Sequence, residues 1–141
     1  MINENLKITG HVKLLLNSEV IREISNLVVD AGKDFVASRM KDSNSAAMAY
    51  MGLGTDSTSP VASDTALHSE VGRAVLTSTQ TSGSEITYTA TFAAGTATAA
   101  LTEAGIFNAD AGGTMLCRTV FPVVNKGASD QISIVWVITA S

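Results

Sequence analysis

The first part of the chain alternates apolar and polar residues in the manner of a β-strand. Residues 6–16 place Ile8, Val12 and Leu14 on one parity, and this period of two is typical of extended backbone. A polar turn cluster follows, and an extended pattern then resumes. The pattern therefore predicts a β-hairpin within residues 1–29.

The apolar period then changes to that of an α-helix. Phe35, Val36 and Met40 are spaced so that they share one face of a helix. Asp30 precedes this stripe and is a residue type that accepts hydrogen bonds from the first helical amides. We therefore expect one short helix over about residues 30–43.

Strand patterns fill most of the remaining chain. Residues 85–94 alternate large apolar residues with threonines, as a strand with one wet face does. Residues 131–140 are apolar on both parities, so we expect that strand to be buried on both faces or to use one face at a subunit contact. The polar segment 55–64 carries Pro60, and we expect it to be the most mobile part of the chain.

Together these patterns predict a mainly β protein. We expect an antiparallel β-sandwich of about seven or eight strands, with one short helix after an N-terminal hairpin. The chain of 141 residues fits a single domain, residues 1–141, whose sandwich body begins at residue 46.

Composition adds the expectation of a protein–protein interface. The chain is 45% hydrophobic and only 16% charged, against about 25% charged residues in an average domain. Such a surplus of apolar surface is typical of an assembling protein, and we expect a homotrimer. The candidate interface residues, which cannot all face one core, are Leu14, Leu15, Leu16, Val135 and Val137.

Charge and hydropathy also argue against two classes of partner. The net charge is −4 and the basic residues are scattered, whereas a nucleic-acid-binding protein carries a basic stripe. No apolar run approaches the ~18 residues that a membrane-spanning helix needs. We therefore expect neither nucleic acid nor membrane as a partner.

Two charges stand inside apolar strand patterns and predict a structural lock. If residues 108–113 form a symmetric loop, Glu103 and Arg118 lie directly opposite each other on adjacent strands. Such a pair would fix the strand register, which the small residues nearby specify weakly. Gly112 and Gly113 would supply the positive φ angles of the loop. Replacing both charges by apolar residues should then restore the stability that one replacement loses.

A second pair of charged residues allows an alternative pairing of the four charges. Glu70 and Arg73 are also embedded in an apolar pattern. They could cross with the first pair, so that Glu70 meets Arg118 and Glu103 meets Arg73. Both arrangements remain possible at this point.

The candidate reactive residues form no catalytic or metal-binding pattern. Glu70 and Glu103 each have an arginine nearby, which would keep them ionised and unsuited to general-acid chemistry. His11 and His68 lack metal-ligand spacing. Cys117 has no histidine placed to activate it. We therefore expect no enzyme, no cofactor, no metal and no small-molecule substrate.

Four segments carry most of the turns and charged residues discussed above. They are "NLVVDAGKDFVASRM" at 26–40, "MGLGTDSTSPVASDTALHSEVGR" at 51–73, "EAGIFNADAGGTMLCRTVFP" at 103–122 and "NKGASDQISIVWVI" at 125–138. Their order is similar to that in small virion structural proteins of tailed bacteriophages, over about residues 12–139. The resemblance is a pattern of turns and charged locks.

The resemblance implies a non-enzymatic virion component. We expect a capsid cement or decoration protein on the outer capsid surface, assembled in the host cytoplasm, with the major capsid protein and copies of itself as partners. The acidic balance disfavours the DNA-lined interior. The alternatives are a tail, neck, baseplate or fibre-associated protein and a β-sandwich module that binds host glycans.

Overall fold

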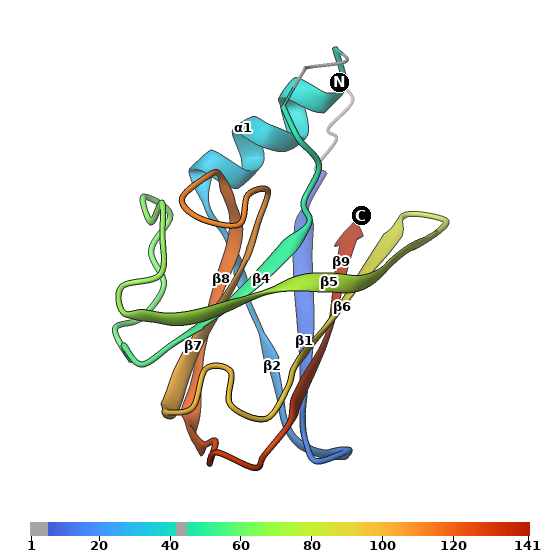
Figure 1. Cartoon of the computed structure of the whole chain (residues 1–141). Helices are drawn as coiled ribbons and strands as arrows, with labels where there is room; N and C mark the ends of the chain where they lie inside the picture. Colours follow the sequence, from blue (N-terminus) through green and yellow to red (C-terminus); the bar gives the residue numbers. More distant parts are fainter. Residues whose placement is uncertain (1–5, 42–44) are drawn as a thin grey trace.

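The computed structural model describes residues 6–41 and 45–141 (Figure 1). Its elements are, in chain order, β1 (Ile8–Leu16), β2 (Glu19–Ser25), β3 (Leu27–Val28), α1 (Asp30–Arg39), β4 (Tyr50–Gly54), β5 (Glu70–Ser82), β6 (Glu85–Phe92), β7 (Ala100–Phe107), β8 (Met115–Asn125) and β9 (Ile132–Ala140). The predicted mainly β, antiparallel fold with one helix is confirmed, with 9 strands in place of seven or eight.

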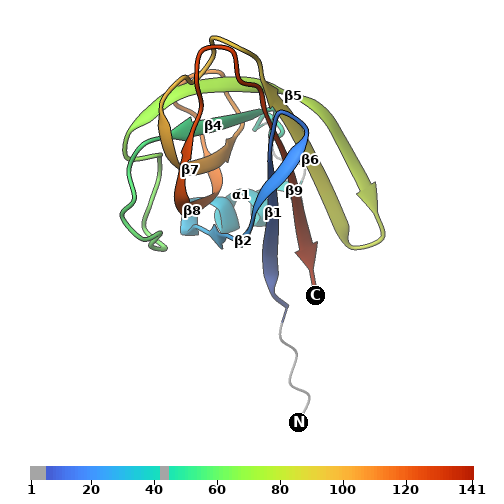
Figure 2. The same ribbon diagram turned by 90° about the horizontal axis from the view of Figure 1, so that it is seen from below.

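The strands form one antiparallel sheet that curls almost into a barrel (Figure 2). Its order is β2-β1-β9-β6-β5-β4-β7-β8-β3. β5 joins the two halves, because residues 70–75 pair with β4 and residues 76–82 pair with β6. At the seam, the Arg22 guanidinium on β2 donates hydrogen bonds to the carbonyls of Pro122 and Val123 on β8.

β1 is an integral strand, not a peripheral one. It pairs with β2 on one side and along its whole length with β9 on the other. Val12 and Leu14 are fully buried in the core. Asn17 and Ser18 form the turn to β2 with positive φ angles of 49° and 74°, as a tight two-residue hairpin turn requires.

The helix is shorter than predicted. It ends at Arg39, and the expected end at residues 42 and 43 lies outside the described residues. Val29 is the N-cap residue and Asp30 the first helical residue, so the expectation that Asp30 caps the helix is wrong. Gly32 is buried against the backbone of β8. A Cβ at this position would lie 2.7 Å from the Leu116 carbonyl carbon, so a larger residue would not fit.

The sheet half β5-β4-β7-β8 carries a second packed layer on its outer face. Leu67, from the segment between β4 and β5, is buried there with Phe107 and Met115. Glycines on the strands make room for it, since a Cβ on Gly52 or Gly105 would lie 3.2 Å or 3.1 Å from a Leu67 methyl carbon. Residues 55–69, the covering loop, therefore close over this face of the sheet.

A buried ionic network as the candidate functional site

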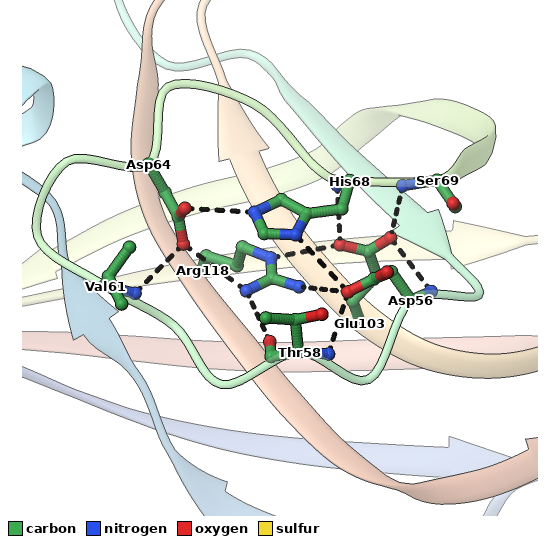
Figure 3. A network of polar contacts seen from close by, with 8 residues as sticks. All are labelled: Asp56, Thr58, Val61, Asp64, His68, Ser69, Glu103 and Arg118. Carbon is green, nitrogen blue, oxygen red and sulfur yellow. Dashed lines mark hydrogen bonds and ion pairs between the residues drawn. The ribbon is translucent and has the colours of Figure 1, made fainter.

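The candidate site lies between the covering loop and the outer face of β7 and β8 (Figure 3). Its centre is the ion pair of Glu103 and Arg118, whose side chains are both 0% exposed. Arg118 Nε donates a hydrogen bond to Glu103 Oε1 at 3.0 Å. The two predicted residues therefore meet, on the face of the sheet that points away from the barrel core.

The predicted register of this pair is wrong. Arg118 lies opposite Gly105, and Glu103 lies opposite Val120, so the ion pair is a diagonal one. The ladder is irregular between Ile106 and Phe107, which breaks the symmetry assumed for the loop. Gly105 has no side chain, and the space where a Cβ would stand is taken by Leu67 of the covering loop.

Glu103 holds three amides of the covering loop. Its Oε1 accepts from the His68 amide at 3.0 Å, and its Oε2 accepts from the Asp56 amide at 3.2 Å and the Ser69 amide at 2.8 Å. With Arg118, each carboxylate oxygen has two donors. The carboxylate is thus fully engaged in fixing both ends of the loop on β7.

Arg118 holds the middle of the same loop. Nη1 donates to the Thr58 carbonyl at 2.9 Å and lies 3.3 Å from Asp64 Oδ2, while Nη2 lies 3.5 Å from Asp56 Oδ1. A guanidinium presents its donors in a planar fork, which suits this radial arrangement of acceptors. These contacts anchor residues 55–64 to β8. They were not expected for the segment that the sequence predicted to be the most mobile.

His68 completes the network between two carboxylates. Nδ1 lies 3.3 Å from Asp56 Oδ1, and Nε2 lies 3.0 Å from Asp64 Oδ1. Hydrogen bonds from the Thr58 backbone and hydroxyl, together with the charges of His68 and Arg118, lower the pKa of Asp56. Asp56 therefore retains its charge beside the guanidinium.

The pKa of Asp64 reflects two opposed influences. Burial is the larger single one and raises it. Hydrogen bonds from His68 and the Val61 amide, with the charge of Arg118, outweigh burial, so the pKa is lowered below its ordinary value. The network thus supplies the electrostatic compensation that a buried carboxylate needs.

Glu70 and Arg73 form a second, separate site. Arg73 donates from Nε to Glu70 Oε2 at 2.8 Å and from Nη2 to Oε1 at 2.7 Å. Val71 is the extra residue of a bulge in β5, which brings both charges onto one face. The crossed network is therefore not formed: Glu70 pairs with Arg73, and Glu103 pairs with Arg118.

Arg73 pins the loop between β7 and β8. Nη1 donates to the carbonyls of Ala109 at 2.8 Å and Gly112 at 3.0 Å, and the guanidinium lies 3.7 Å from the centre of the Phe107 ring. Gly112 and Gly113 have φ angles of 61° and 75°, so the predicted positive values are confirmed. Each arginine thus fixes one loop.

The predicted interface residues separate into two groups. Leu14 is fully buried in the core, so its assignment to an interface is wrong. Leu15, Leu16, Val135 and Val137 are half-buried, and Leu16 packs against the core. Alternation leaves Val135 and Val137 on the outer face of β9, whose other parity is buried.

The remaining reactive residues are placed as structural groups. Burial raises the pKa of the Cys117 thiol well above its ordinary value, so the thiolate is disfavoured. His11 is exposed, 3.4 Å from Glu23. Within residues 6–41 and 45–141, no cluster of His, Cys, Asp or Glu could hold a metal ion, and no helix is long and apolar enough to span a membrane.

Sequence reasoning missed Asp56 and Asp64 as partners of Arg118, and His68 as the residue that lies between these two aspartates. Taken singly, they are loop aspartates and a histidine without metal-ligand spacing. One signal could have found them. They are the only titratable residues of segment 55–69, so that segment offers them no partner of opposite charge other than each other.

Comparison with known proteins finds no matching protein family, no similar curated protein and no similar solved structure. The fold and the site define an antiparallel β protein that uses buried charge to fix surface loops.

Proposed function

We propose that this chain is a non-enzymatic structural protein of a tailed-bacteriophage virion, a cement or decoration protein on the outer capsid surface. The observation that carries the proposal is what the charged residues contact in segments 51–73 and 103–122, two of the segments that resemble phage virion proteins. Glu103, Arg118, Glu70 and Arg73 direct their polar atoms to one another and to loop backbone. This use suits a protein whose task is to present a fixed shape.

The outer face of the sheet supports an assembly role. Val135 and Val137 on β9 are half-buried beside threonines of β6, and the net charge of the chain is low. A surface of this kind suits contact with a protein. The proposed partners are the major capsid protein and copies of this chain, in a trimer, with no part for nucleic acid, membrane or substrate.

Immunogold labelling of phage particles that carry the chain tests the proposal. Label spread over the head is the expected result. Label confined to the tail, neck or baseplate would replace the capsid role by a tail role. Absence of the chain from washed particles, with binding on a glycan array, would favour the glycan-binding alternative and reject the virion role.

A further inference from the structure

One edge of β5 lacks a strand partner. β4 pairs with β5 only over residues 70–75, while β6 occupies the other edge of residues 76–82. In the part of the chain that the structure describes, no strand pairs with the remaining edge of 77–82. Figure 2 shows β5 and β6 extending together away from the barrel, with β5 on the outside.

The free backbone groups of this edge follow from the turn. Gly83 has a φ of 58° and begins a two-residue turn that closes on the pair of Ser82 and Glu85. Antiparallel pairs alternate between hydrogen-bonded and non-hydrogen-bonded ones. Ser82 and Gln80 therefore bond to β6, and the amide and carbonyl of Thr79 and Thr81 point outward along the free edge.

This edge lacks the proline and the charged side chains that usually protect an edge against strand addition, and the one bulge of β5 beside it, at Thr77, lies at its start. Residues 77–82 contain no proline, lysine or other charge, and all of them are exposed. The edge of β2, in contrast, bears Arg22, whose guanidinium closes the seam to β8. An uncharged, threonine-rich free edge is a template for another β-strand.

We propose that the free edge of β5 pairs antiparallel with the same edge of a second copy of this chain. A two-fold axis at Gln80 places Thr79 of one copy opposite Thr81 of the other, so their outward amides and carbonyls bond to each other. It also places Ser78 opposite Ser82. Every facing pair is neutral, and hydroxyl-bearing pairs across strands are favourable.

The second copy is the occupant that the residues favour. The edge offers no charge that would select a basic or acidic partner strand, and it repeats hydroxyl residues on both sides of Gln80, so it is complementary to itself. A contact made by one short edge is small, so we expect a dissociation constant between about 1 µM and 1 mM. The inference goes beyond the virion proposal and does not rest on it.

Sedimentation of the full chain and two variants tests the pairing. Thr79→Pro removes an amide that bonds to nothing in the isolated chain, and proline is tolerated on the free side of an edge strand. Thr79→Ala keeps the amide and is the matched control. At about 1 mM, pairing in this range of dissociation constants should give the wild-type chain and Thr79→Ala an average mass about 1.5 to 2 times that of Thr79→Pro. Any oligomer that forms through other surfaces should be common to all three proteins.

Equal masses for the wild-type chain and a folded Thr79→Pro would overturn the proposal. Amide exchange in the wild-type chain gives a second readout that needs no variant. The Thr79 and Thr81 amides should become protected as concentration rises, while exchange of the exposed loop amides stays constant. If Thr79→Pro does not fold, this measurement decides: exchange of both amides at the same rate at every concentration rejects the pairing.

Discussion

The Arg118 and Arg73 sites perform the same local task with different amounts of burial. Each arginine pairs with a glutamate on the outer face of the sheet. Arg118 also donates to one loop carbonyl and Arg73 to two. Glu103 and Arg118 are both 0% exposed, whereas Glu70 is 28% and Arg73 is 9% exposed. The chief difference is therefore access of water to the carboxylate.

Burial changes what happens when one partner is lost. At the Arg73 site, water reaches the Glu70 carboxylate and can replace part of what a lost partner supplied, so this partly exposed pair should contribute less to stability. At the Arg118 site, both side chains are 0% exposed, so water cannot replace the hydrogen bonds that a lost partner made. The buried site also joins more segments, because Glu103 binds three loop amides in addition to the guanidinium. It should thus govern the stability of the whole fold.

The largest predicted effect is that of Glu103→Ala. It should lower the free energy of unfolding by about 3–5 kcal/mol, because it removes the fully buried partner of Arg118 and leaves three loop amides without an acceptor. Glu70→Ala, its matched control at the other site, should cost about 1 kcal/mol or less. Urea unfolding of the two variants measures both values. Similar losses would mean that burial does not separate the two sites.

The double replacement Glu103→Val with Arg118→Leu tests how much the loop contacts of the buried site contribute to stability. The sequence alone predicted that an apolar pair would restore stability. The structure reverses this expectation, since three loop amides and the Thr58 carbonyl would lose their partners. The double variant should be no more stable than Glu103→Ala. A double-mutant cycle measures the coupling, and recovery to near wild-type stability would contradict the loop contacts.

The sequence predicted the members of this site better than their arrangement. Glu103 and Arg118 are visible as charges inside apolar strands, and the antiparallel fold is visible from alternation. The register was not predictable, because the bulges of β7 and β8 depend on packing rather than on local pattern. Nor were Asp56 and Asp64 predictable as partners, because they lie far from Arg118 in sequence and join it only when the loop folds back.

A pair of glycine substitutions compares the space around the two sites. A Cβ on Gly54 would lie 2.6 Å from the Ser69 carbonyl oxygen and would also press on Glu103, so Gly54→Ala should cost about 1–3 kcal/mol. Gly112, in the loop held by Arg73, has open space around it and a φ of 61°. Gly112→Ala should cost only the backbone strain, about 1 kcal/mol. Thermal unfolding ranks the two, and the reverse order would reject the close packing under the covering loop.

Acid should weaken the Arg118 site through its aspartates. The pKa values of Asp56 and Asp64 are lowered from 3.8 in the folded chain, so their contribution is present at neutral pH and is lost as pH falls through the lowered values. Unfolding free energies measured between about pH 5 and pH 2 should therefore decline. Asp64→Asn should be less stable at neutral pH and should show a shallower decline. An unchanged slope would exclude Asp64 as a source of the acid sensitivity.

The smallest predicted effect is that of Arg73→Lys. A lysine keeps the charge near Glu70 but cannot donate in the planar fork that reaches Glu70 and the Ala109 and Gly112 carbonyls together. Because water reaches this site, we expect a global loss of about 1 kcal/mol or less. The effect should instead be local: amides of residues 108–114 should exchange faster, while those of residues 55–69 keep their protection. Faster exchange in both loops would show that the two arginine sites are coupled, and the comparison between a global lock and a local one would fail.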